Sequence, residues 1–233
     1  MPIPLYSIKN LYIKHRNEEK LQIKQFDIHR GACYVFEGRM GSGKTTFLEV
    51  LYSRKKIGKG KVKFEEKDIH SYSNREYNGQ IAVVPQQFSP PWGKVENYIL
   101  KTIRKYLHIK NPNKRLDEIV RKMNLSSLLK RKMKILTPGE LRWVVLAAQI
   151  ATDTKVLFID EYEQHLGKED IKKLNNILYR KINYDGITLI TTTQNKDLVN
   201  RLASVIITLE NGRITSLRSF SKKKDNYRNK RRK

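Results

Sequence analysis

The sequence predicts an α/β domain with a largely parallel sheet. Three short apolar runs have the composition of strands buried on both faces: ACYVF (32–36), KVLFID (155–160) and TLITTT (188–193). Helical periodicity lies between them, at Leu116, Ile119, Val120 and Met123 and, approximately, at Ile171, Leu174, Ile177 and Leu178. Strands that alternate with helices are typical of a parallel sheet covered by helices.

Length and composition are those of one large globular domain. The chain has 233 residues, of which 39% are hydrophobic, enough to build a buried core. No window contains eighteen uninterrupted apolar residues, and the start, MPIPLYSIKN, lacks a signal-peptide pattern. We therefore expect a cytoplasmic protein. The single cysteine, Cys33, lies in an apolar run and is expected to be a buried packing residue.

Positive charge is concentrated in two segments. The chain carries 48 Lys and Arg against 23 Asp and Glu, a net charge of +25. Residues 101–134 hold twelve basic and two acidic side chains, and residues 218–233 hold nine basic and one acidic. The second segment lacks apolar periodicity, which predicts a flexible tail. Either the tail is only solvated, or the basic segments contact anionic lipid, nucleic acid or another acidic partner.

The first buried run leads into EGRMGSGKTTF, where Gly38, Gly43, Lys44 and Thr45 satisfy G-x-x-x-x-G-K-[ST] between a strand and a helix. Glycines let the backbone wrap a phosphate, the helix start presents its positive end, the lysine reaches the β- and γ-phosphates, and the threonine hydroxyl binds Mg²⁺. A chance glycine turn is improbable in this context. We predict a nucleoside triphosphate site whose loop also includes Gly41, Ser42 and Thr46.

A second apolar run, KVLFIDE, ends in the adjacent carboxylates Asp160 and Glu161. Successive side chains at a strand end point in different directions, so the two can serve different purposes. We expect Asp160 to hold the Mg²⁺ shell and Glu161 to polarise the attacking water as general base. A strand that merely happens to end in acids is the minority interpretation once the phosphate loop is present.

The stretch LTPGE (136–140) begins the long apolar segment LRWVVLAAQIA, which leads into KVLFIDE. It resembles the segment of ATP-binding cassette (ABC) ATPases in which the signature LSGGQ heads a helix before the magnesium-binding strand. The resemblance implies that Thr137, Gly139 and the helix start cap the γ-phosphate of ATP bound by a second subunit. Pro138 and Glu140 depart from the usual glycine and glutamine.

Further motifs of the family follow in order between about Ile8 and Leu217. IAVVPQQF places Gln86 in the family's glutamine loop, where it would contact Mg²⁺ and water, with Gln87 as the less favoured register. ITLITTTQN and LASVIITLENGRI match the family's switch loop and terminal hairpin, with NG as the turn. The resemblance implies one domain over residues 1–217: a RecA-like P-loop core with an antiparallel β part and an inserted helical subdomain at about 88–150. Residues 218–233 form the tail.

Three positions depart from the family or leave its pattern open. Gln194 occupies the switch position, where histidine is usual, and Gly167 stands where an aspartate is common. Glutamine can hydrogen-bond to γ-phosphate and Glu161 but cannot carry histidine's positive charge, which favours slow turnover. Tyr12 is available to stack on adenine, although the usual spacing is nearer His15, and core packing is the other interpretation of Tyr12.

The resemblance implies an ATPase that uses ATP and Mg²⁺ as the motor of a transporter-type complex on the cytoplasmic face of a membrane. Its expected partners are separate transmembrane subunits and a second cassette, identical or different, in a head-to-tail dimer. One alternative is a non-transport cassette protein acting on nucleic acid or ribosomes, which the charge of +25 favours. Another is a regulatory ATP-binding module with slow hydrolysis, which Gln194 and Gly167 favour.

Overall fold

The structure is a computed structural model that describes residues 3–15, 18–53, 55 and 57–220. The predicted tail therefore lies outside the described residues from residue 221 onward. The strands are β1 (Tyr6–His15), β2 (Glu18–Ile28), β3 (Cys33–Glu37), β4 (Lys59–Phe64), β5 (Lys67–Asp68), β6 (Ile81–Val84), β7 (Val156–Ile159), β8 (Thr188–Thr193), β9 (Val205–Glu210) and β10 (Arg213–Ser219). The helices are α1 (Lys44–Ser53), α2 (Asn74–Asn78), α3 (Val95–Ile103), α4 (Pro112–Met123), α5 (Pro138–Ile150) and α6 (Lys168–Asn183), with 3₁₀ turns at Ile69–Ser71, Met133–Ile135 and Lys196–Leu198.

A six-stranded sheet forms the centre of the molecule, in the order β10-β9-β3-β8-β7-β6. All neighbours from β9 to β6 are parallel, and only β10 is antiparallel. The three strands predicted from apolar runs are adjacent in space as β3, β8 and β7, and every residue of β7 and β8 is buried. The predicted parallel sheet is confirmed. Because parallel strands end at one edge, the loops that follow β3, β7 and β8 are brought together there.

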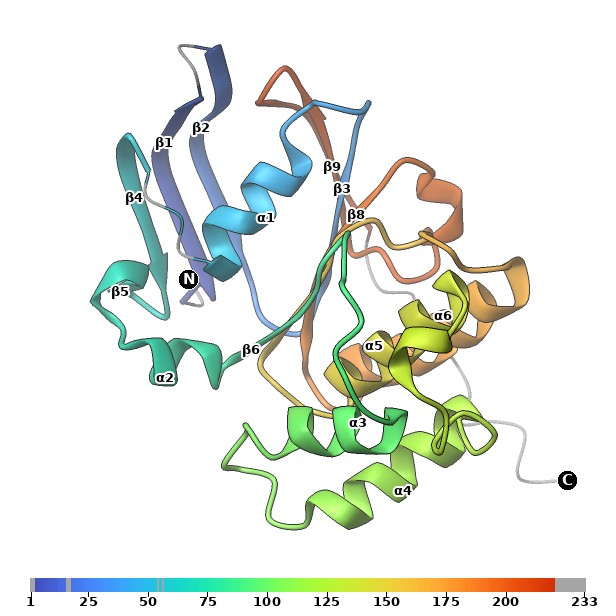
Figure 1. Ribbon diagram of the computed structural model, residues 1–233. Coiled ribbons are helices and arrows are strands. Elements are labelled where there is room, and N and C mark those ends of the chain that lie inside the picture. Colours follow the sequence, from blue (N-terminus) through green and yellow to red (C-terminus); the bar gives the residue numbers. More distant parts are fainter. Residues whose placement is uncertain (1–2, 16–17, 54, 56, 221–233) are drawn as a thin grey trace, which may run out of the picture.

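A second, antiparallel sheet has the order β2-β1-β4-β5. Helix α1 lies between the two sheets (Figure 1). Its residues Phe47 and Leu51 share one buried apolar cluster with Leu11 of β1 and Phe36 of β3. This arrangement confirms the predicted antiparallel part and fixes α1 from both sides. The phosphate-loop helix is therefore held rigidly against the core.

Helices α3, α4, α5 and α6 lie on the other side of the six-stranded sheet (Figure 1). Both helical faces predicted from periodicity are buried in one cluster, at Leu116, Ile119, Val120 and Met123 of α4 and at Ile171, Leu174, Ile177 and Leu178 of α6. Helices α3 and α4 fall within the span predicted for the helical subdomain, and α5 carries the LTPGE stretch at its start.

The C-terminal hairpin forms where NG predicts its turn. Asn211 and Gly212 connect β9 to β10, with φ of 47° and 75°, the left-handed values that a two-residue hairpin turn requires. Strand β10 continues to Ser219, two residues beyond the domain end expected at Leu217. Cys33 is fully buried, as predicted for a packing residue. Among the described residues, no helix combines the length and apolar character needed to cross a membrane.

Candidate functional site

The loop between β3 and α1 requires glycine at its two ends. Gly38 has a φ of 153°, and a Cβ there would lie 2.3 Å from the Leu209 carbonyl oxygen. Gly43 has a φ of 101°, and a Cβ there would lie 2.9 Å from the Lys20 carbonyl oxygen. Other residues would clash or strain the backbone. The loop therefore approaches neighbouring backbone closely and delivers the first turn of α1 to the edge of the sheet, as a phosphate cradle requires.

Lys44 is the first residue of α1 and its side chain turns back into this loop. Its Nζ donates to the carbonyl oxygens of Gly38 (2.7 Å) and Arg39 (2.9 Å) and lies 3.4 Å from the hydroxyl of Ser42. Burial lowers the pKa of Lys44, and the nearby carboxylates of Glu161, Asp160 and Glu163 oppose that shift. Gly41 is exposed in this loop, and Thr46 is half-buried in the first turn of α1. The ammonium is thus held inside the loop by the carbonyl oxygens of Gly38 and Arg39.

Asp160 and Thr45 meet at the end of β7. Asp160 is 2% exposed, and its Oδ1 accepts hydrogen bonds from Thr192 Oγ1 (2.6 Å) and Thr45 Oγ1 (3.3 Å). Mg²⁺ prefers oxygen ligands and commonly takes only one or two from protein, with water and phosphate completing its shell. A hydroxyl beside a carboxylate fits that requirement. No group of three His, Cys, Asp or Glu side chains forms a metal site in the described part of the chain.

Glu161 and Gln194 face each other across the ends of β7 and β8. Gln194 Nε2 donates to Glu161 Oε1 at 3.3 Å. Glu161 has a φ of 51°, uncommon for a residue with a side chain, and its backbone N–H donates to Thr192 Oγ1 at 2.7 Å. The pair that the resemblance implied for water activation is therefore within hydrogen-bonding distance. Such geometry suits a base whose carboxylate is oriented by an amide.

The sequence analysis did not identify Arg142, whose side chain binds the backbone of two strand ends at this edge. The side chain is 5% exposed; its Nη1 donates to the Pro85 carbonyl (2.6 Å), and its Nη2 donates to the carbonyls of Asp160 (2.7 Å) and Glu161 (2.8 Å). Burial lowers its pKa to about 10, against the opposing charges of Asp160, Glu161 and Glu163. An arginine inside the apolar run LRWVVLAAQI was the available signal. Its guanidinium fixes the backbone of both acids and the residue before Gln86.

The LTPGE stretch is the start of α5 and forms a capping box. Thr137 Oγ1 accepts from the Glu140 N–H (3.3 Å), and Glu140 Oε2 accepts from the Thr137 N–H (2.9 Å). Arg131 Nη1 donates to the other Glu140 oxygen at 2.7 Å. In the part of the chain that the structure describes, no hydrogen bond joins Thr137 or Gly139 to residues 38–46. The stretch and the phosphate loop of one chain are therefore not directly connected.

Two other predicted site residues, Gln86 and Tyr12, line two different pockets. Gln86 lines a pocket of about 330 Å³ together with Arg142 and His165. Tyr12 lies between the buried residues Leu11 and Ile13 of β1, so its ring faces away from the core, where Lys14 Nζ lies 5.7 Å from the ring centroid. The pocket that Tyr12 lines contains no phosphate-loop residue. The structure thus places Gln86 and Arg142 in the lining of one pocket but does not bring Tyr12 to Lys44. The His15 side chain lies outside the described residues.

Comparisons with known proteins agree with this geometry. The family model described as ABC transporter matches residues 21–164. The cell division ATP-binding protein FtsE of Streptococcus pneumoniae is 30% identical over 80% of this chain and 83% of its own length. The lipoprotein-releasing system ATP-binding protein LolD of Syntrophus aciditrophicus is 27% identical over 88% of this chain and 95% of its own. The dimeric bacterial ABC transporter cassette MJ0796 has the same fold, with a TM-score of 0.82 at 22% identity over 93% of this chain and 99% of its own. The chain therefore belongs to the ABC transporter family and is an ATP-hydrolysing, ATP-binding subunit of that family.

Proposed function

We propose that this chain is the motor subunit of a transporter-type membrane complex and that it uses the site at the sheet edge to hydrolyse ATP. One observation carries the proposal: Lys44, Thr45, Asp160, Glu161 and Gln194 come from three separate strand ends and converge at one edge. A phosphate-binding loop, a magnesium-type oxygen pair and a base with an amide partner are the components that phosphoryl transfer to water requires.

Each residue has a distinct role in the proposal. Lys44 and the loop amides hold the phosphates, with Ser42 keeping the ammonium in place. Mg²⁺, when bound, would neutralise charge on the phosphate oxygens, and Thr45, Gln86 and Asp160 would hold it. Glu161 accepts a proton from the attacking water while Gln194 orients its carboxylate. Because Gln194 is neutral and Gly167 replaces an acid, turnover is slower than with a charged switch residue.

A second cassette completes the site in the proposal. Thr137 and Gly139 begin a helix of thirteen residues whose first amides favour an anion, and they have no hydrogen bond to the phosphate loop of their own chain among the described residues. The related cassette MJ0796 is a dimer. ATP would bridge two chains, each supplying one half. The nucleotide-driven closure would then move separate membrane subunits on the cytoplasmic side.

The basic segment 101–134 also suits a position beside an anionic membrane. Lys101, Arg104 and Lys105 are exposed on and just after α3, line one shallow pocket, and form no ion pair with any residue that the structure describes. Phosphate headgroups would neutralise such cations. Co-sedimentation with phosphatidylglycerol vesicles, absent with phosphatidylcholine vesicles, is the expected result. Equal sedimentation with both would contradict this contact. The named relatives do not favour the nucleic-acid alternative.

The test of the proposed function is Glu161→Gln. The amide keeps the shape and the hydrogen-bonding reach of the carboxylate but cannot take a proton, so ATP should bind while hydrolysis falls by at least about a hundredfold. Size-exclusion chromatography with ATP and Mg²⁺ should then show a dimer that ADP does not support. If Glu161→Gln hydrolyses ATP as fast as the parent, another residue activates the water.

A further inference from the structure

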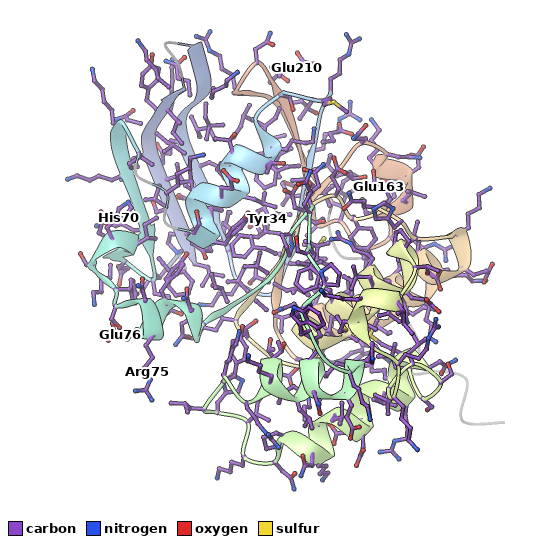
Figure 2. The ribbon with its side chains drawn as sticks, viewed as in Figure 1. Tyr34, His70, Arg75, Glu76, Glu163 and Glu210 are labelled. Carbon is purple, nitrogen blue, oxygen red and sulfur yellow. The ribbon has the colours of Figure 1, made fainter. Side chains whose placement is uncertain are left out.

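Glu163 lies in the loop that follows β7, two residues beyond Glu161, and both of its oxygens bind the loop after β8. Its Oε1 accepts from the backbone N–H of Gln194 at 2.9 Å. Its Oε2 accepts from Thr193 Oγ1, also at 2.9 Å. Figure 2 shows Glu163 among the loops at this edge of the sheet. One carboxylate therefore binds two successive residues of the segment that carries the switch side chain.

The topology explains why this bridge forms. Strands β7 and β8 are parallel neighbours, with Ile159 opposite Thr191, so the loops leaving them start side by side. Thr193 is fully buried, whereas Gln194 is exposed. The chain thus leaves the sheet between these two residues. Hydrogen bonds to a carboxylate are stronger than those between neutral groups. Glu163 therefore fixes the direction of the backbone at Gln194, the first residue after β8.

The direction of that exit decides where the Gln194 amide points. Its Nε2 donates to Glu161 Oε1 at 3.3 Å, a longer bond than either bond that Glu163 accepts. Glu161 is held independently, by Thr192 through its N–H and by Arg142 through its carbonyl. The switch side chain has no comparable support of its own. The backbone N–H of Gln194 is held by Glu163 at 2.9 Å, one residue after the buried end of β8.

We propose that Glu163 is a positioning residue for ATP hydrolysis: it sets the backbone at Gln194 so that the Gln194 amide meets Glu161. This inference rests on the proposed role of Gln194 in the active site. In this proposal Glu161 takes the proton from water, and Glu163 acts by binding residues 193 and 194 with its two oxygens. Its geometric role and its negative charge can therefore be separated by experiment.

Three variants separate them. Glu163→Ala removes both bonds, so kcat should fall about tenfold while the KM for ATP stays within about twofold. Glu163→Gln keeps an oxygen for the Gln194 N–H, and its NH₂ can donate to Thr193 Oγ1, which is 3.0 Å from the Asn195 carbonyl and can donate there instead. This neutral variant should regain most of the lost kcat. Glu169→Ala, an exposed acid in the first turn of α6, is the matched control.

Amide hydrogen exchange gives a readout that does not depend on turnover. In the full-length chain, mass spectrometry of peptides covering residues 189–200 should show exchange at Gln194 about tenfold faster in Glu163→Ala than in the parent. Glu163→Gln and Glu169→Ala should stay within about threefold of the parent. Unchanged exchange in Glu163→Ala would overturn the inference, and so would a Glu163→Gln variant as inactive as Glu163→Ala.

A double variant tests whether Glu163 acts through Gln194. If it does, Glu163→Ala adds less than about a twofold loss of kcat once Gln194→Ala is present. A full tenfold loss in that background would show an independent role and overturn the inference. A normal rate in Gln194→Ala would remove Gln194 from the active site and refute the inference together with that part of the proposed function. A slow Gln194→Ala beside a normal Glu163→Ala refutes the inference alone.

Discussion

Replacing Arg142 with Met should destabilise the protein and slow ATP hydrolysis together. Methionine keeps most of the buried volume, so the loss reports bonds and not a cavity. Arg142 donates to three carbonyl oxygens, of Pro85, Asp160 and Glu161, at 2.6 to 2.8 Å. Bonds from a charged donor contribute about 1.5 kcal/mol each, and part of that sum is offset by relief of burying the cation. We expect the free energy of unfolding to fall by about 3 kcal/mol.

Thermal melting monitored by circular dichroism measures the effect. For a chain of this length, about 3 kcal/mol corresponds to a lower melting temperature by about 6 to 12 °C. The control is Arg104→Met, an exposed arginine at the end of α3, which should change stability by less than about 0.5 kcal/mol. The rate of ATP hydrolysis, measured well below the melting temperature, should fall because Asp160 and Glu161 lose their backbone anchor. If Arg142→Met has the same melting temperature and the same rate of ATP hydrolysis as Arg104→Met, then Arg142 does not support the backbone of Asp160 and Glu161.

Three further substitutions test the site. Lys44→Ala should abolish ATP binding in a fluorescent-nucleotide titration, because loop amides alone only partly offset phosphate charge; unchanged affinity would contradict the assignment. Gln194→His should preserve or raise phosphate release, since imidazole can make the same bond with an optional charge, and a fall of tenfold or more would contradict this role. Glu140→Gln removes a negative charge from the start of α5 and should lower the ATP concentration needed for dimerisation in sizing chromatography. An unchanged ATP requirement would contradict a place for Glu140 beside the γ-phosphate.

The sequence alone predicted the parts of the site that depend on local order. The phosphate loop is one continuous segment, so the spacing of Gly38, Gly43, Lys44 and Thr45 in the sequence is enough to recognise it. The three central strands were recognisable because full burial on both faces demands continuous apolar residues. Helices α4 and α6 were recognisable because their buried faces recur with helical period.

Only the tertiary structure decided which distant residues support Asp160 and Glu161. Arg142 lies in the apolar run that follows LTPGE, and Glu163 lies just after KVLFIDE. The sequence around each residue does not indicate which groups it will bind. Their roles arise because β7 and β8 are neighbours and α5 packs behind them, which places the Pro85, Asp160 and Glu161 carbonyls around one guanidinium and residues 193 and 194 around one carboxylate. The position of the Tyr12 ring was likewise decided by the tertiary structure, because the pleat of β1 directs it away from the core. Sequence fixes what a residue can bond to, whereas the pairing of strands far apart in the chain determines which groups come within bonding distance.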